Sequence, residues 1–211
     1  MASKYNRVLP AIIAAVGWLG VLLQLKVAAG HALAQGQEAW RGIVDALCYF
    51  TVLTNILVSL TATMRALGTR SVLTRPSALA ASAVYIAVVA LIYSLLLRSL
   101  WAPEGVHRIA DQILHDLTPL LYVLWWVLWA PKGGLHFRDA VWWLGYPLAY
   151  FAFSLLLGAA SGRYLYPFAD VAAHGLPAVA RNGVMLLALF LLLGTVLVAA
   201  ARVLPGRERR V

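Results

Sequence analysis

The chain has 211 residues, of which 63% are hydrophobic and only 12% are charged. A soluble domain of this length needs more polar residues to cover its surface, so the composition excludes an ordinary soluble protein and predicts an integral membrane protein. The formal net charge is +9, but Lys and Arg stand between apolar runs, which indicates membrane topology and not nucleic-acid binding. The single cysteine, Cys48, excludes an intrachain disulfide.

Charge-free apolar runs predict six transmembrane helices, because about 20 helical residues cross the hydrocarbon layer of a bilayer. In chain order the predicted spans cover residues 8–28, 42–64, 77–99, 109–130, 139–160 and 181–203. Helices are expected because lipid cannot satisfy exposed backbone groups. The connections are short, so we expect a single all-α transmembrane domain over residues 1–211.

Lys and Arg are distributed unequally between the two ends of the predicted spans. Eleven lie on the side that holds both termini, and six lie on the opposite side. The positive-inside rule therefore predicts that both termini are cytoplasmic in a multi-pass protein of the plasma (inner) membrane. The first apolar run, residues 8–25, has 18 residues and is longer than the about 7–15 of a signal peptide, so we interpret it as a span.

Polar side chains follow one face of the second predicted span. The members of this polar stripe are Asp45, Cys48, Thr51, Asn55, Ser59 and Thr63. At about 100° per residue they share one side of a helix, and the opposite side is Leu, Ile and Val, so the stripe is expected to face the bundle interior. It predicts either hydrogen bonds that hold helices together or part of a functional site.

A second polar stripe follows the fourth predicted span. Its members are Asp111, His115, Thr118, Tyr122, Trp126 and Trp129. An ionisable group inside a membrane is a functional hypothesis by default, and a structural histidine bonded to a neighbouring hydroxyl is the alternative. Pro119 removes the helical hydrogen bond to the carbonyl of His115 and is expected to distort the helix there.

One residue of each stripe is predicted to lie in the outer half of the membrane. At 1.5 Å per residue, Thr51 lies about 15 Å and His115 about 9 Å from the outer ends of their predicted spans. Tilt of the helices or a kink at Pro119 would bring the two side chains together. A hydroxyl beside an imidazole is the minimal pair of nucleophile and base, so the stripes suggest hydrolysis.

Two other interpretations remain open. His107, Asp111 and His115 recur at four-residue spacing, and their nitrogen and oxygen ligands would suit zinc in a metal-dependent membrane hydrolase. The polar stripes would equally serve a non-enzymatic lipid-binding, transport or assembly protein. The sequence has no nucleophile elbow, Walker loop or dinucleotide fingerprint, which leaves a soluble-type serine hydrolase, an ATPase and a nicotinamide enzyme without support.

Four patches of sequence, taken together, resemble one family. They are residues 49–55 (YFTVLTN), 115–119 (HDLTP), 145–147 (GYP) followed by Tyr150, and 162–168 (GRYLYPF). Their order and spacing are similar to those of the androgen-induced-protein family of multipass membrane proteins and its bacterial relatives. The resemblance implies a hydrolase of fatty acid esters of hydroxy fatty acids, with Thr51 as the intramembrane nucleophile and His115 as its base.

The expected mechanism assigns supporting roles to other polar residues. Asn55, one turn from Thr51, would donate to the developing oxyanion, and Asp116 or Asp111 would orient the imidazole. Arg98 and Arg181, near the outer ends of their spans, would either anchor those spans at the membrane interface or hold a lipid carboxylate. We expect membrane lipids or fatty-acyl esters as partners and no cofactor, and the sequence leaves the oligomeric state open.

Overall fold

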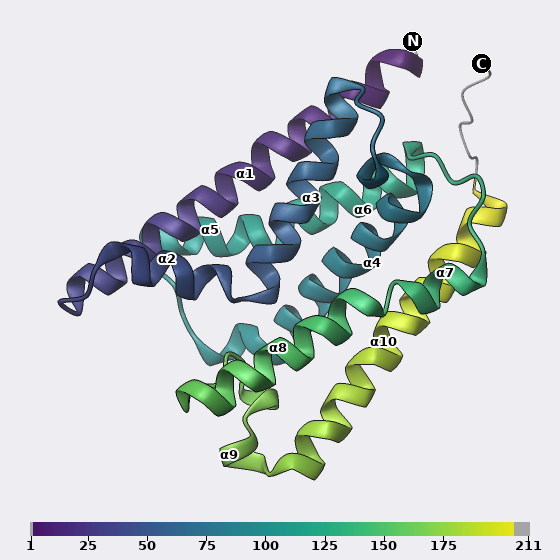
Figure 1. The fold of residues 1–211 in the computed structure, drawn as a ribbon. Coiled ribbons are helices and arrows are strands. Elements are labelled where there is room, and N and C mark those ends of the chain that lie inside the picture. The colour runs from purple at the N-terminus through teal and green to yellow at the C-terminus, as the bar shows by residue number, and fades with distance from the viewer. Residues whose placement is uncertain (1, 205–211) are drawn as a thin grey trace. The chain divides into compact units, whose positions relative to one another are not determined.

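The computed structural model describes residues 2–204, which consist of helices joined by loops, with no strand in that range (Figure 1). The chain divides into two compact units, one formed by Met1–Leu135 with Ala201–Val211 and the other by His136–Ala200. The all-helical class predicted from the sequence is therefore confirmed. The sequence led us to expect one domain, and the contacts along the chain separate into two groups.

The first unit contains α-helices interrupted by short turns of other helical types. Its elements are α1 (Ala2–Ala34), α2 (Ala39–Leu47), α3 (Phe50–Leu67), η1 (Val72–Thr74), α4 (Pro76–Ile92), η2 (Tyr93–Leu97), η3 (Arg98–Leu100), α5 (Gly105–Gln112), η4 (Ile113–Leu117) and α6 (Thr118–Trp129). The turns η2 and η4 are π-helical, whereas η1 and η3 are 3-10 turns. Helix α1 packs against α2, α3, α5 and α6, and α4 packs against α3 and α6.

Two glycines allow α1 to lie directly against its neighbours. A Cβ at Gly17 would stand 2.2 Å from the hydroxyl of Ser59 on α3. A Cβ at Gly20 would stand 2.5 Å from the side chain of Ile113 in η4. Because any side chain at these positions would collide with its neighbour, the backbone of α1 is in contact with both α3 and η4.

The second unit consists of α7 (Phe137–Trp142), α8 (Gly145–Ser161), η5 (Pro167–Ala169), α9 (Val171–His174) and the part of α10 (Leu176–Val203) up to residue 200. Helices α8 and α10 meet where the ring of Phe151 lies over Gly183. The loop between α8 and α10 is fastened to α10 by the Asn182 side chain, which donates to the carbonyl of Phe168 at 2.8 Å.

Within residues 2–204, five helical stretches are long and apolar enough to cross a membrane. They are Arg7–Ala34, Phe50–Leu67, Pro76–Leu100, Phe137–Ser161 and Leu176–Val203. The predicted second span, 42–64, is not one helix, because the chain leaves helical geometry at Cys48 and Tyr49 between α2 and α3. The predicted fourth span, 109–130, consists of the end of α5, the π-helical turn η4 and α6, so it is not a single α-helix. The composition of these helices shows a protein suited to a membrane.

Candidate functional site

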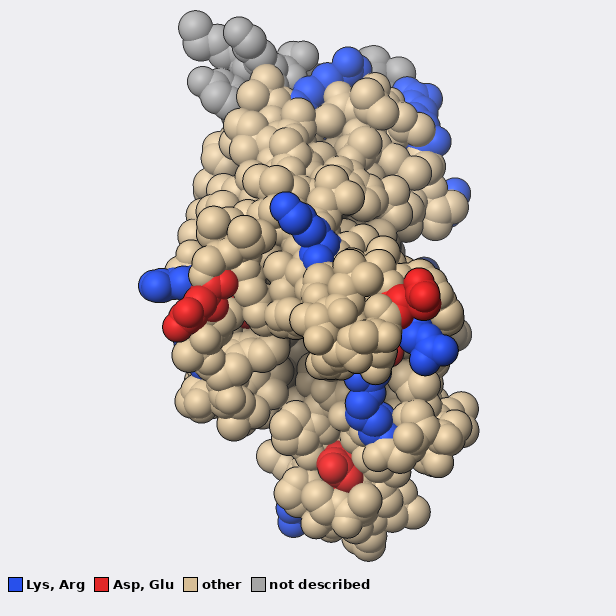
Figure 2. Space-filling model, turned by 90° about the vertical axis from the view of Figure 1, so that its left-hand side faces the viewer, with Lys and Arg blue, Asp and Glu red and all other residues tan. Residues whose placement is uncertain are grey.

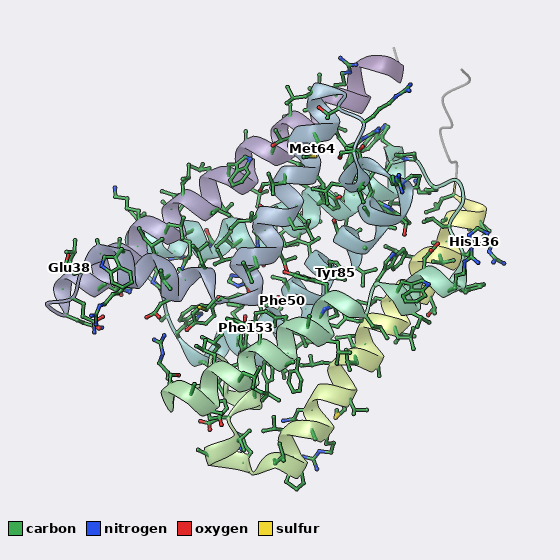
Figure 3. The ribbon with its side chains drawn as sticks, viewed as in Figure 1. Glu38, Phe50, Met64, Tyr85, His136 and Phe153 are labelled. Atoms are coloured by element: carbon green, nitrogen blue, oxygen red, sulfur yellow. The ribbon has the colours of Figure 1, made fainter. Side chains whose placement is uncertain are left out.

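The break between α2 and α3 sets the position of Thr51. Tyr49 has an extended backbone, with φ of −82° and ψ of 135°, and α3 begins at Phe50, which marks the start of that helix in Figure 3. Thr51 is therefore the second residue of an 18-residue helix. The sequence had suggested instead that Thr51 lies inside a continuous span. The first N–H groups of a helix have no acceptor within it, and its dipole is positive at this end. The Thr51 hydroxyl thus lies in a locally positive environment.

The polar stripe on α3 forms a ladder of side-chain hydrogen bonds to the backbone one turn earlier. Asn55 Nδ2 donates to the carbonyl of Thr51 at 2.9 Å, Ser59 Oγ to that of Asn55 at 2.7 Å, and Thr63 Oγ1 to that of Ser59 at 2.7 Å. Asn55 and Ser59 are fully buried, as predicted for an inward-facing stripe. These three side chains stabilise the helix and its contacts.

Thr51 is the exception in this ladder. The carbonyl one turn earlier belongs to Leu47, which lies in α2 on the other side of the break. Within the described part of the chain, the Thr51 hydroxyl makes no hydrogen bond. Its oxygen is not one of the fully buried polar atoms without a partner. The interruption of the helix therefore leaves this hydroxyl available for chemistry.

His115 lies in the π-helical turn η4, and one of its ring nitrogens is held by Asp111. Nδ1 is 3.0 Å from the backbone carbonyl oxygen of Asp111 and 3.1 Å from its carboxylate oxygen Oδ1. The contact with the carbonyl is a hydrogen bond, whereas Oδ1 has no hydrogen-bond partner and lies within ion-pair distance of Nδ1. Because both neighbours are acceptors, Nδ1 is the nitrogen that carries the hydrogen, and Nε2 of the neutral ring keeps its lone pair. Nε2 makes no hydrogen bond with the described residues, so it is free to accept a proton.

Two aromatic residues that sequence reasoning did not assign to the site complete the surroundings of this pair. The Tyr93 hydroxyl donates to Asp111 Oδ2 at 2.5 Å and accepts from Trp101 Nε1 at 3.2 Å. The Tyr93 ring stacks on the His115 ring, with centroids 3.7 Å apart and planes 15° from parallel. Tyr93 lies near the outer end of the third predicted span, where a tyrosine ordinarily marks the membrane interface, so no pattern in the sequence indicated this contact.

The two predicted orienting carboxylates have different partners. Asp111 contacts the imidazole, whereas Asp116 forms an ion pair with Arg98, which also lies over the Tyr93 ring at 4.9 Å. The ion pair is about half exposed, at 48% for Arg98 and 44% for Asp116. Arg98 thus holds a carboxylate of the chain itself in this structure. Arg181 is exposed on α10 in the other unit.

Pro119 explains the helical geometry beside His115. In η4 the N–H of Thr118 donates to the carbonyl of Ile113, five residues earlier, so the distortion expected at Pro119 takes the form of a π-helical turn. In this register the next carbonyl, that of Leu114, would pair with residue 119, and proline has no N–H. The carbonyl of Leu114 is therefore left without a helical donor. Turns of this type are frequent at functional sites.

Asn55 supplies the missing donor and so connects the two halves of the candidate site. Its Nδ2 donates to the carbonyl of Leu114 at 3.2 Å as well as to the carbonyl of Thr51. One buried amide therefore ties the first turn of α3 to the residue before His115. Both of its hydrogens are used in this way, so the carboxamide is not available as the oxyanion donor that the sequence suggested. No hydrogen bond joins Thr51 Oγ1 to the His115 ring among the described residues.

The alternative zinc set is not brought together. His107 meets the rings of His31 and Trp101, at centroid distances of 5.6 and 5.4 Å, and only Asp111 and His115 of the three proposed ligands are in contact. Within residues 2–204, no group of three or more His, Cys, Asp or Glu side chains is arranged to hold a metal ion.

Comparison of this chain with protein-family models, with curated proteins and with solved structures finds no match. The resemblance to the androgen-induced-protein family stays a prediction from the four sequence patches. The proposal for the function therefore rests on the contacts of Asn55, Asp111 and His115 in the first unit.

Proposed function

We propose that this chain is an intramembrane lipid-ester hydrolase in which Thr51 is the nucleophile and His115 is its general base. The observation that carries the proposal is the Asp111–His115 pair, which fixes the imidazole with Nδ1 protonated and Nε2 unbonded. The second support is the unbonded hydroxyl of Thr51 at the N-terminus of α3. Asn55 ties the backbone beside these two residues together, so both belong to one rigidly connected region.

The proposed reaction begins when His115 Nε2 takes the proton of the Thr51 hydroxyl as Oγ1 attacks the ester carbonyl carbon. Backbone N–H groups in the first turn of α3 stabilise the negative charge on the carbonyl oxygen, because they have no acceptor within the helix. The C–O bond to the alcohol then breaks, and the alcohol oxygen takes the proton from His115. Water, activated by the same imidazole, hydrolyses the acyl ester on Thr51 and restores the hydroxyl. Asp111 keeps the ring in the correct tautomer and orientation throughout.

The surface around η2 and η4 supports an acyl-chain substrate. Leu95 and Leu96 on η2 are exposed, as are Leu117 at the end of η4 and Leu120 on α6. In a membrane these side chains contact lipid tails, so an acyl ester reaches the site from the bilayer. Fatty acid esters of hydroxy fatty acids are the substrate class that the sequence resemblance favours.

The proposal includes a six-span topology in the plasma (inner) membrane, with both termini cytoplasmic. In it, the end of α5, the turn η4 and α6 cross the membrane together as the fourth span in chain order, in addition to the five long helices, because they follow one another without leaving helical geometry. Figure 2 shows Lys and Arg side chains gathered near the end of the first unit where α1 begins, and Arg7 there lies against Gly68 at the C-terminus of α3. An excess of positive charge marks a cytoplasmic end. Reporter fusions at the C-terminus that are active only outside the cytoplasm would contradict this topology.

The test of the chemistry compares Thr51→Ala with Thr63→Ala in detergent-purified protein. Both variants remove a hydroxyl from the same face of α3, but the Thr63 hydroxyl bonds the backbone and accepts from Trp18 Nε1 at 3.1 Å. We expect wild-type protein and Thr63→Ala to hydrolyse a fatty-acyl ester and to be labelled covalently by an ester-directed probe. Thr51→Ala should do neither. Hydrolysis by Thr51→Ala at the wild-type rate would exclude Thr51 as the nucleophile.

The hydrogen-bond ladder on α3 favours a second candidate, a non-enzymatic membrane protein that binds lipids or assembles with other proteins. In that case Asn55, Ser59 and Thr63 hold the helices together and Thr51 has no chemical task. The same assay separates the two, because the non-enzymatic protein would show no hydrolysis and no labelling in its wild-type form.

A further inference from the structure

We infer that Tyr93 is a positioning residue that holds the Asp111–His115 pair in its reactive arrangement. This inference rests on the proposed function, and it concerns a residue that does not itself touch the reacting atoms. Tyr93 contacts both members of the pair at once, Asp111 through its hydroxyl and His115 through the face of its ring. Its side chain is almost completely buried, with 3% of its surface exposed.

The hydrogen bonds around the Tyr93 hydroxyl have a fixed direction. Trp101 Nε1 can only donate, so the hydroxyl oxygen accepts from it. The single hydrogen of the hydroxyl is then directed to Asp111 Oδ2, since a carboxylate only accepts. With Oδ2 occupied, Oδ1 is the carboxylate oxygen that faces His115 Nδ1. The chain of donors from Trp101 through Tyr93 therefore fixes which carboxylate oxygen meets the imidazole.

The ring of Tyr93 restrains the imidazole in a second way. Two rings stacked 3.7 Å apart and 15° from parallel prevent rotation of the imidazole out of its plane. A half-turn about the Cβ–Cγ bond would bring Cδ2 to the place of Nδ1, and the ring would lose its nitrogen contact with Asp111. Stacking alone could be supplied by phenylalanine, so the hydroxyl is the feature that links this packing to the carboxylate.

Both residues of the stack lie in π-helical turns. Tyr93 is the first residue of η2, where the N–H of Arg98 donates to the carbonyl of Tyr93, and His115 is in the middle of η4. A π-helical turn holds more residues than an α-helical turn, so each one rotates its side chains away from the α-helical register. The two deviations in separate segments of the first unit meet at one aromatic contact.

The experiment compares Tyr93→Phe with Tyr122→Phe, which is a matched control because Tyr122 is a buried tyrosine that bonds Thr61 at 3.2 Å and not the Asp–His pair. Histidine labelled with nitrogen-15 reports the tautomer of His115, and its signals are assigned by their absence in His115→Asn. In wild-type protein and in Tyr122→Phe we expect hydrogen on Nδ1 alone. In Tyr93→Phe we expect a mixture of tautomers and a decrease in kcat of about tenfold with KM unchanged.

Trp101→Phe provides an independent variant, since it removes the donor that directs the Tyr93 hydroxyl and should shift the tautomer in the same direction. Unchanged nitrogen signals in both Tyr93→Phe and Trp101→Phe would overturn the inference. The spectroscopic result does not depend on turnover. If the two variants change the tautomer of His115 but the wild-type protein hydrolyses no ester, the positioning role is supported and the proposed function is excluded.

Discussion

The hydrogen bond from Asn55 to the carbonyl of Leu114 should depend on Pro119. Pro119 denies that carbonyl its helical donor, and Asn55 replaces it from α3. We expect Asn55→Leu to lower the free energy of unfolding by about 1–2 kcal/mol, because the buried carbonyl of Leu114 loses its partner. Hydrogen bonds between membrane helices contribute about 0.6 kcal/mol on average, so the effect should exceed that of an ordinary pair.

A double-mutant cycle isolates the cause. Pro119→Ala restores an N–H at position 119, and this group can serve the carbonyl of Leu114 without Asn55. Asn55→Leu should therefore cost about 1 kcal/mol less in the Pro119→Ala background than in the wild type. Unfolding in mixed micelles, followed by tryptophan fluorescence against increasing denaturing detergent, measures all four proteins. Equal costs of Asn55→Leu in the two backgrounds would refute the assignment of Leu114 as the carbonyl that Pro119 leaves unpaired.

Two further predictions separate residues with similar chemistry. Asp111→Asn should decrease kcat for ester hydrolysis by at least about 100-fold by disturbing the tautomer, whereas Asp116→Asn should stay within about threefold of the wild type; equal losses in steady-state assays would contradict the roles given to the two carboxylates. Gly20→Leu should lower the unfolding free energy by about 1–3 kcal/mol because its Cβ would meet Ile113 at 2.5 Å, while Gly30→Leu, with no atom within 4 Å of a Cβ, should leave it nearly unchanged. Comparable unfolding midpoints for the two glycine variants would show that α1 does not lie as close to η4 as described.

The sequence predicted the features that depend on composition and on helical periodicity. The excess of apolar residues indicated helices suited to a membrane, and the buried positions of Asn55, Ser59, Asp111 and His115 follow from stripes at helical spacing. The pairing of Asp111 with His115 was one of two options, and four-residue spacing on one helix is what allows it.

The remaining features depend on tertiary contacts that a single sequence does not encode locally. The break between α2 and α3 falls at Cys48 and Tyr49, neither of which is a helix-breaking Gly or Pro. The position of Thr51 at a helix N-terminus therefore had no local signal in the sequence. Pro119 signalled a distortion but not its type, and only the π-helical register identifies Leu114 as a carbonyl that lacks a helical donor. The role of Tyr93 depends on contact with a segment 18 residues further along the chain.

Because His115 lies in a π-helical turn, the number of residues in that turn matters as much as which residues they are. A π-helical turn contains roughly one residue more than an α-helical turn, so removal of a single residue between Ile113 and Leu117 would allow ordinary α-helix to re-form there. The helices before and after the turn would keep their faces, because the extra residue is absorbed within the turn itself. The residues inside the segment, His115 among them, would take α-helical positions and lose their present orientation, even though no side chain of the site had been replaced. Homologous proteins that keep all the polar residues but differ by one residue in this segment should therefore differ in activity.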